Sequence, residues 1–311
     1  MSERIPYDEF GLFHENAAEF GLSFDRPPTV RRESVALAGG RTLSALVWGD
    51  TPPELVLIHG GAQNAHTWDT VALALGRPLL AVDLPGHGHS GDVAPAATGR
   101  LRADGLADDV AVAIRALAPD AAVVVGMSLG GMTAMCLADR YPDLVRRLVL
   151  VDVTPGVTAA KAKAITDFVN GPATFASFDD ILARTVQHNP TRTVTSLRRG
   201  ILHNAVQQPD DSWVWRHRRF TPATGTTATA ETRPDYGPLW DRLGSVRMPV
   251  LLVRGMRPQS VVDDADEAEF RRRLPGAEVA RVADAGHSVQ GDTPLELAAL
   301  LEAFSFGPTA P

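Results

Sequence analysis

The stretch Gly126-Met127-Ser128-Leu129-Gly130 decides the fold, because of the segments on either side of it. An apolar, β-branched run, Ala121 to Val125, precedes it, and an alanine- and leucine-containing segment, Gly131 to Arg140, follows it. This order predicts a strand, a sharp turn and a helix, with the serine hydroxyl raised above the sheet at the helix N-terminus. Ser128 is therefore the candidate nucleophile. The alternative interpretation is a tight turn that merely needs glycines.

The composition is that of an ordinary globular protein. The chain has 311 residues, of which 44% are hydrophobic and 22% charged, and its formal net charge is −7. This length allows one large domain or a domain with an insertion. The acidic balance argues against nucleic acid or an anionic membrane as the main partner. The single cysteine, Cys136, excludes an internal disulfide framework, and its apolar helical setting predicts that it is buried.

The first 30 residues are expected to form an N-terminal extension. Met1 to Phe10 contains three acidic residues and lacks the apolar region of a secretory signal. No uninterrupted apolar segment of the chain is long enough to span a bilayer, so we expect a cytoplasmic protein with no membrane partner. The phenylalanine-rich extension predicts a short helix that ends before Pro27-Pro28. It packs either on its own body or on a second copy, which leaves a homodimer open.

Short apolar strands alternate with helices through most of the remaining chain. The expected strands are Ser34 to Leu37, Leu43 to Trp48, Leu55 to Ile58, Leu79 to Val82, Ala121 to Val125, Leu148 to Val151, Val250 to Val253 and Glu278 to Val282. The helices expected between and after them are His66 to Leu75, Leu101 to Leu117, the segment after Ser128, Ala265 to Leu274 and Pro294 to Phe304. This pattern indicates an α/β fold with a mostly parallel, doubly wound sheet covered on both faces. Functional residues are then expected at the carboxyl ends of the strands.

The alternation breaks between Thr158 and Gly244, where we expect no buried strand. The segment predicts helices over Ala159 to Val169, Phe178 to Gln187 and Thr193 to Val206, and a loop over Thr221 to Thr232. We interpret it as an insertion that sits on the sheet. Its aromatic residues hint at an apolar or aromatic ligand, although aromatic residues also build cores: Phe175, Phe178, Trp213, Trp215 and Phe220.

A serine hydroxyl needs a base, and His287 is the histidine that we choose for this role. It follows the last expected strand, which puts it on a loop at the same edge of the sheet as Ser128. Backbone N–H groups of Gly61 and Leu129 are expected to form the oxyanion hole. The residues expected to line the substrate site are Gly60, Ala62, Gln63, Trp68 and Met127, with Trp68 alternatively anchoring the helix that follows it.

Two places in the sequence offer the acid that would orient His287. Asp152 ends the strand Leu148 to Val151, and Asp263 and Asp264 lie on the loop that follows the strand Val250 to Val253. The ends of these neighbouring strands are both expected near the histidine, so the residues alone leave the two sites open. The remaining histidines show no metal-ligand spacing, and we expect neither a metal nor another cofactor. We assign His87 and His89 to loop structure.

Taken together, several motifs make the chain resemble an α/β-hydrolase fold enzyme, a serine hydrolase with a helical cap. They are His59-Gly60-Gly61, Asp83-Leu84-Pro85-Gly86-His87-Gly88-His89-Ser90, Gly126 to Gly130, Tyr141-Pro142 and Gly286-His287. The resemblance implies a cap after strand six. The domains would then be an extension over 1–30, a hydrolase core over 31–153 and 246–311, and a cap over 154–245.

The resemblance also bears on the acid. The family commonly carries an aspartate a few residues after the glycine of the seventh-strand loop, where this chain has Pro258, Gln259 and Ser260. Some members, including haloalkane dehalogenases and zearalenone-type lactone hydrolases, carry the acid at the end of strand six instead. Asp152 matches that place, and we favour it over Asp263 or Asp264.

The expected activity is acyl transfer from a small-molecule ester, lactone or related substrate through Ser128, His287 and Asp152. A dehalogenase or epoxide hydrolase of this fold would carry aspartate in place of Ser128. Two alternatives remain: a carbon–carbon bond hydrolase of the same fold, and a non-catalytic small-molecule receptor on a hydrolase scaffold.

Overall fold

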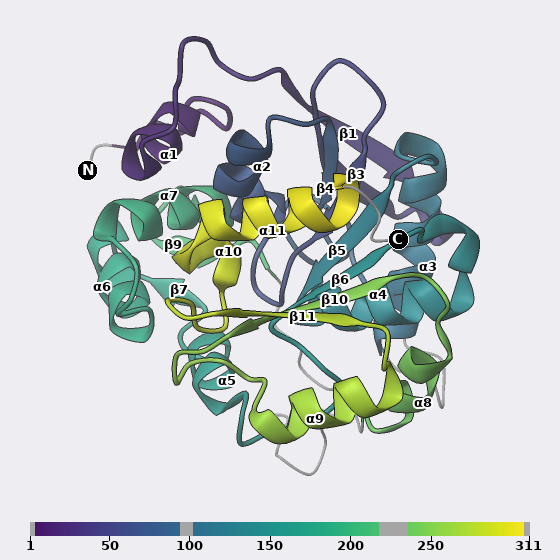
Figure 1. Cartoon of the computed structure of the whole chain (residues 1–311). Helices are drawn as coiled ribbons and strands as arrows, with labels where there is room; N and C mark the ends of the chain where they lie inside the picture. The colour runs from purple at the N-terminus through teal and green to yellow at the C-terminus, as the bar shows by residue number, and fades with distance from the viewer. Residues whose placement is uncertain (1–3, 94–101, 218–235, 308–311) are drawn as a thin grey trace.

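A central eight-stranded sheet organises the chain, in the order β1-β2-β4-β3-β5-β6-β10-β11 (Figure 1). The computed structural model describes residues 4–93, 102–217 and 236–307. The strands are β1 (Val30–Ala36), β2 (Thr42–Trp48), β3 (Leu55–Ile58), β4 (Leu79–Val82), β5 (Val123–Met127), β6 (Leu148–Val151), β10 (Val250–Gly255) and β11 (Glu278–Val282). The pairs β1–β2 and β2–β4 are antiparallel, and the other neighbours are parallel. The predicted α/β class with a mostly parallel sheet is confirmed.

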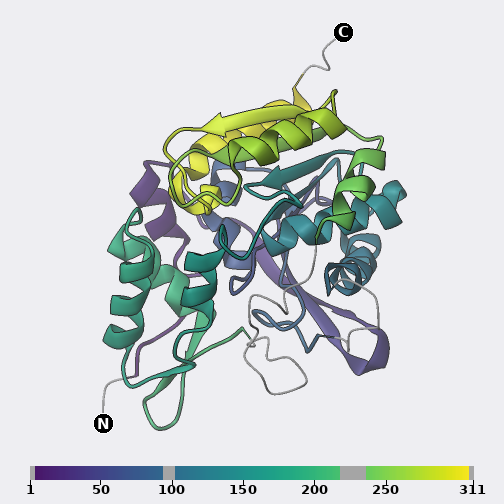
Figure 2. The same ribbon diagram turned by 90° about the horizontal axis from the view of Figure 1, so that it is seen from below.

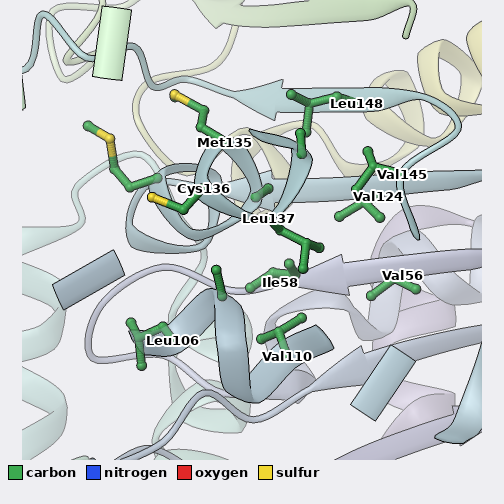
Figure 3. Packing of buried hydrophobic residues seen from close by; sticks show 14 of the residues in the cluster. Val56, Ile58, Leu106, Val110, Val124, Met135, Cys136, Leu137, Val145 and Leu148 are labelled. Carbon is green, nitrogen blue, oxygen red and sulfur yellow. The ribbon is translucent and has the colours of Figure 1, made fainter. Parts of the chain in front are cut away.

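Helices cover both faces of the sheet because the strands are apolar on both faces. In β3, Leu55 and Leu57 belong to one hydrophobic core cluster, and Val56 and Ile58 belong to another, as the alternation of side chains along a strand requires. The second cluster lies under α3 (Arg102–Leu117), α4 (Leu129–Arg140), α8 (Pro238–Ser245) and α9 (Asp264–Arg273) (Figure 3). The first lies under α1 (Phe13–Phe20), α2 (Asp69–Leu75) and α11 (Pro294–Phe306). Cys136 is buried in α4, as predicted.

The segment between β6 and β10 builds a separate layer at one end of the sheet (Figure 2). It contains α5 (Lys163–Val169), α6 (Phe178–His188), α7 (Val194–Asn204) and a small antiparallel sheet of β7 (Thr174–Phe175), β9 (Trp213–Trp215) and β8 (Ala205–Gln207). These strands were not expected, because two or three residues are too few to show an alternating pattern.

The aromatic residues of this layer form its own core rather than a uniform ligand wall. Phe175 and Trp213 are buried in its hydrophobic cluster, with Phe178 and Trp215 packed against it. Phe220 and the tract Thr221 to Thr232 lie outside the described residues.

One helix inside the predicted cap range 154–245 lies with the core instead. Leu239, Trp240 and Leu243 of α8 are buried in the cluster beneath α3, α4 and α9. The helix is amphipathic, and its apolar side covers the sheet layer rather than the cap. The other predicted domain limits remain predictions.

The N-terminal extension contacts both the core and the cap. Phe13 of α1 is buried in the core, whereas Glu15 and Glu19 of the same helix pair with Arg199 of α7. Ahead of α1, the Tyr7 hydroxyl lies 2.8 Å from Nδ1 of His203, also in α7. Figures 1 and 2 both show α1 beside α7 and α6. Among the residues described, none of the helices combines the length and apolarity needed to cross a bilayer.

Candidate active site

Ser128 lies in the sharp turn between β5 and α4, with φ 52° and ψ −117°. This is a strained backbone for a residue other than glycine, and such strain is characteristic of a serine presented at the top of a sheet. Two glycines let the turn form. A Cβ on Gly126 would lie 2.4 Å from the Gly130 carbonyl oxygen, and one on Gly130 would lie 2.2 Å from the Ile58 carbonyl oxygen.

His287 and Asp152 meet at the carboxyl edge of the sheet. Nδ1 of His287, on the loop after β11, lies 2.9 Å from Oδ2 of Asp152, at the end of β6. Asp152 is fully buried and His287 is 8% exposed. Nε2 of His287 has no hydrogen-bond partner among the described residues, and His287 and Ser128 line the same cavity. The contact with Asp152 therefore orients the imidazole through Nδ1, and Nε2 can accept a proton from a nucleophile.

Asp152 is held by the loop after β10. Its Oδ1 accepts hydrogen bonds from the Gly255 N–H at 3.0 Å and the Ser260 hydroxyl at 2.6 Å, and its Oδ2 accepts one from the Val261 N–H at 3.0 Å. The place where the family commonly carries its acid therefore supplies donors to an acid on the neighbouring strand. These donors fix the carboxylate orientation and stabilise its charge.

The two alternative acids lie elsewhere. Asp263 caps α9 by accepting a hydrogen bond from the Asp266 N–H at 2.9 Å, and it pairs with Lys161 at 2.8 Å. The Asp264 side chain is 93% exposed and pairs with Arg254 at 2.8 Å. Neither carboxylate contacts His287, so the structure brings only Asp152 to the histidine.

The loop after β3 is pinned next to the serine turn by His59. Its Nε2 accepts a hydrogen bond from the Leu84 N–H at 2.9 Å, and its Nδ1 lies 2.7 Å from the Gly60 carbonyl oxygen. Burial lowers the pKa of His59, which keeps the ring neutral, as these two bonds require. A Cβ on Gly60 would lie 2.5 Å from the Met127 sulfur, so a larger residue here would require the Met127 side chain to move. Within the described ranges, the N–H groups of Gly61 and Leu129 have no acceptor.

A cavity of about 170 Å³ lies over Ser128 and His287. Of the residues expected to line the substrate site, Gly60, Ala62, Gln63 and Met127 do so, as does Gly61. Cap residues complete the wall, among them Ile165, Phe168, His188, Asn189 and Thr191, together with Gln259 of the core. Sequence reasoning missed these cap residues and Gln259, because no local pattern tells which side of a cap helix or loop faces the sheet.

Trp68 is the exception among the expected lining residues. It is fully buried and does not line this cavity. The short helix η2 (Ala65–Trp68) turns the indole into the core cluster that contains Phe13 and Val71. Trp68 therefore anchors the start of α2, which was the alternative interpretation.

A second cavity, of about 150 Å³, adjoins the first. The two share four lining residues: Gln63, Phe168, Asn189 and Ser288. Unlike the first cavity, the second one is lined by arginines, Arg192 and Arg199. His66, Asp69 and His203 also line it.

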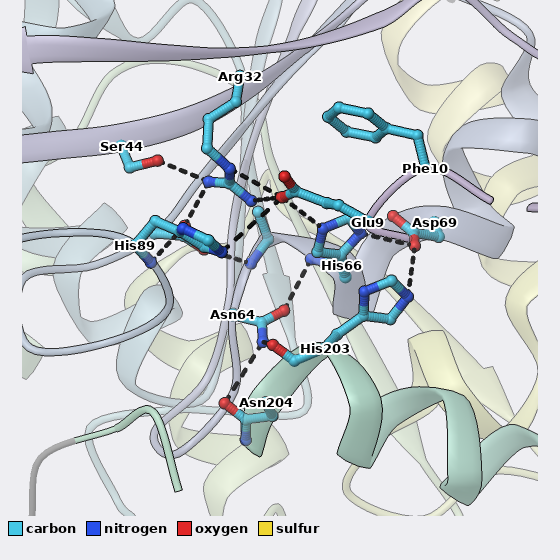
Figure 4. Close-up of polar contacts among 12 residues, drawn as sticks. Glu9, Phe10, Arg32, Ser44, Asn64, His66, Asp69, His89, His203 and Asn204 are labelled. Atoms are coloured by element: carbon cyan, nitrogen blue, oxygen red, sulfur yellow. Dashed lines mark hydrogen bonds and ion pairs between the residues drawn. The ribbon is translucent and has the colours of Figure 1, made fainter. Parts of the chain in front are cut away.

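Three of these residues form a cluster with atoms suited to bind a metal ion (Figure 4). The ligand atoms of His66, Asp69 and His203 lie within 4.8 Å of one another, a proximity that the sequence did not reveal. The two rings are stacked, however, with centroids 3.8 Å apart and planes 12° apart. Nearly parallel rings do not direct two lone pairs at one point, so a shared ion would require one ring to turn.

His66, Asp69 and His203 are better explained as part of a network of charged side chains than as a metal site. Nδ1 of His66 lies 2.9 Å from Asp69 Oδ2, and its Nε2 lies 3.1 Å from Glu9 Oε1. Burial alone would lower the pKa of His66, but the two carboxylates outweigh burial and raise it to about 9. Burial and the neighbouring His66 charge lower the pKa of His203 well below its usual value. One imidazolium therefore stacks on one neutral imidazole.

Two more histidines, His87 and His89, lie on the loop after β4, and they line neither cavity. His87 is buried beside His59, with ring centroids 5.1 Å apart, and His89 is exposed.

The chain is similar to known hydrolases in both sequence and structure. A family model of the alpha/beta hydrolase fold matches residues 53–294, a range that includes Ser128, Asp152 and His287. Esterase Rv0045c of Mycobacterium tuberculosis is 41% identical over 302 residues, covering 93% of each chain. A crystal structure of that esterase aligns with a TM-score of 0.78 and 40% identity, over 97% of this chain and 99% of the other. The 2-(acetamidomethylene)succinate hydrolase of Mesorhizobium japonicum is 31% identical over 249 residues, covering 78% of this chain and 84% of the relative.

Proposed function

The chain belongs to the α/β-hydrolase fold family, and on that premise we propose that it hydrolyses carboxylic esters through Ser128, His287 and Asp152. The observation that carries the proposal is the 2.9 Å contact between His287 Nδ1 and Asp152 Oδ2. Within the part of the chain that the structure describes, Nε2 is left without a partner at the cavity that Ser128 also lines. An oriented histidine with one free nitrogen beside a strained serine is the arrangement that activates a hydroxyl for attack.

The reaction has two halves. His287 Nε2 takes the proton from the Ser128 hydroxyl as its oxygen attacks the ester carbonyl, and the Gly61 and Leu129 N–H groups stabilise the oxyanion. The carbon–oxygen bond to the alcohol breaks, and His287 gives that proton to the departing oxygen. A water molecule then attacks the acyl-serine with His287 again as base, which releases the acid and restores Ser128. Asp152 holds the Nδ1–H and stabilises the transient imidazolium.

The shape of the catalytic cavity favours a small substrate with an apolar acyl group. Its volume is about 170 Å³, and Met127, Ile165 and Phe168 contribute apolar walls. A lactone presents the same carbonyl chemistry and is part of the proposal. The free Nε2 of His287 favours an enzyme over a receptor, since a binding-only site has no use for it.

Hydrolysis of p-nitrophenyl acetate, butyrate, hexanoate and laurate tests the proposal. We expect the short esters to give the highest kcat/KM and Ser128→Ala to lose up to about 10⁶-fold in kcat. A mass shift of the intact protein by one acyl group, absent in Ser128→Ala, identifies the covalent intermediate. Turnover that survives Ser128→Ala would refute the mechanism.

A further inference from the structure

Arg192, just before α7, reaches into the second cavity and is fixed there from two sides. Its Nη2 donates a hydrogen bond to the Ser196 hydroxyl. Its guanidinium also lies against Gly291 of α10 (Val289–Asp292), where a Cβ would lie 2.8 Å from Nη1. Arg192 therefore lies between α7 of the cap and the segment that follows His287.

No counter-ion accompanies this guanidinium. In the part of the chain that the structure describes, no carboxylate oxygen lies within 4.0 Å of it, and its buried Nε has no hydrogen-bond partner. Asp292 and Glu19 act on it only from a distance. Both are engaged elsewhere: Asp292 accepts hydrogen bonds from Thr191 and Gly286, and Glu19 accepts them from Thr193 and Arg199.

Burial without a counter-ion lowers the pKa of Arg192, which shows how little compensates the charge. Arg192 as a whole is only partly buried, but its Nε is shielded from solvent. A charge that is partly withdrawn from water and lacks a partner is unfavourable, and a ligand of opposite charge would relieve that cost.

The other charged side chains of the cavity have partners. Arg199 pairs with Glu15 and Glu19, and the His66 imidazolium lies between Asp69 and Glu9. These contacts give the other cationic groups of the cavity direct carboxylate partners, which Arg192 lacks among the described residues.

The second cavity continues the catalytic one. Gln63, Phe168, Asn189 and Ser288 line both. At their junction Thr191 lines the catalytic cavity, while the next residue, Arg192, lines the other. The two cavities meet at these shared residues, so a ligand that reacts at Ser128 would have to pass between them to reach the guanidinium.

We propose that Arg192 forms a carboxylate-binding subsite, and that the preferred substrates are half-esters whose free carboxylate lies distant from the scissile ester. The proposal rests on the esterase function argued above. The planar guanidinium matches a carboxylate through two parallel hydrogen bonds, which a neutral group cannot reproduce. The Ser196 hydroxyl and the Asn189 amide line the same cavity and offer further polar contacts to a carboxylate.

Matched substrates test the subsite. The monomethyl esters of succinate, glutarate and adipate are compared with methyl esters in which a carboxamide replaces the carboxylate. We expect the wild type to prefer at least one acid over its amide by about tenfold or more in kcat/KM. In Arg192→Gln that acid-to-amide ratio should fall about tenfold or more, and Arg192→Lys should be intermediate because an ammonium lacks the planar fork.

Two further variants separate the charge from its position. Arg198→Gln removes a neighbouring cation of α7 that does not line the cavity, and the ratio should stay at the wild-type value. Gly291→Ala keeps the Arg192 charge but introduces a Cβ that displaces the guanidinium, so the ratio should fall. Thermal unfolding of each variant checks that the fold is retained.

Binding gives a readout that needs no turnover. Calorimetric titration of Ser128→Ala protein with glutarate or adipate should show binding that weakens about tenfold or more when Arg192→Gln is added. If the ratio and the binding are both indifferent to Arg192, the subsite is refuted and Arg192 is a clamp between α7 and α10. If carboxylate binding needs Arg192 but no ester is cleaved at Ser128, the esterase proposal fails and the subsite stands.

Discussion

A carboxylate can reach the same histidine from either of two neighbouring strands. β6 and β10 run parallel side by side, with Val151 opposite Val253, so their carboxyl ends share one edge. In this chain Asp152 comes from β6, and the loop after β10 holds it through Gly255, Ser260 and Val261. The preference for Asp152 came from the family resemblance, because Pro258, Gln259 and Ser260 occupy the place where the family commonly carries its acid and none of them can serve.

Ser260 gives a prediction at this scale. Its hydroxyl donates a 2.6 Å hydrogen bond to Asp152, and a hydrogen bond to a charged group typically contributes about 1.5–3 kcal/mol. We expect Ser260→Ala to lower kcat/KM for a chromogenic ester about tenfold, and Ser260→Thr, which keeps the hydroxyl, to retain most of it. Equal activity in Ser260→Ala and the wild type would mean that the hydroxyl does not help to position Asp152.

Other residues that line the cavities could not be predicted from their local sequence. Phe168, Asn189 and Arg192 reach the cavities only because cap segments fold back over the sheet. Trp68 was expected at the site because it follows the oxyanion loop closely, yet η2 turns it inward. Position along the chain indicates which loop is near the site, whereas side-chain direction depends on the packing around that loop.

At the scale of elements, sequence patterns located those strands that are buried on both faces. The limits of β3, β4 and β6 agree with the expected ranges, because a continuous apolar run ends abruptly where the chain leaves the sheet. The limits of β11 also agree, although this edge strand is only partly buried. No helix was expected at α8; its residues only fell within the range expected for the cap, whereas its apolar side is buried in the core. A burial pattern therefore does not tell which layer of the molecule an element packs against.

The N-terminal extension is an element whose attachment should depend on pH. Burial opposes the ionisation of Glu9, but hydrogen bonds from His66 and Arg32 outweigh it and lower the pKa of Glu9 from 4.5 to about 2. Its stabilising effect is present above pH 4.5 and is lost as the pH falls through about 2. The raised pKa of His66 gives stability below pH 6.5 that is lost as the pH rises through about 9.

Both contributions are therefore complete only between about pH 4.5 and 6.5. We expect Glu9→Gln to lower Tm most in this window and less at pH 10, where the Arg32 contact alone remains. Differential scanning calorimetry of the two proteins across the range measures the difference. A Tm difference that is constant from pH 5 to pH 10 would show that the Glu9–His66 pair does not hold the extension.

At the scale of the whole molecule, the two cavities lie between the sheet edge and the cap, and Phe168 borders both. Removing its ring should merge them into one longer space. We expect Phe168→Ala to raise the kcat/KM ratio of laurate to butyrate esters about tenfold, since each methylene that becomes buried contributes ~0.8 kcal/mol. Phe178→Ala is the control, because Phe178 packs in the cap cluster and lines neither cavity. Ratios that change equally in both variants would point to a general loosening of the cap.

The central claim is that Asp152 orients His287, and that His287 activates Ser128. The most direct test is the rate at which a fluorophosphonate probe labels Ser128, with the labelled peptide mapped by mass spectrometry, in the wild type, Asp152→Asn and Asp263→Asn. We expect rapid labelling of Ser128 in the wild type, a fall on the order of 10⁴ in Asp152→Asn, and a rate near that of the wild type in Asp263→Asn. Labelling that stays rapid in Asp152→Asn and collapses in Asp263→Asn would contradict the claim.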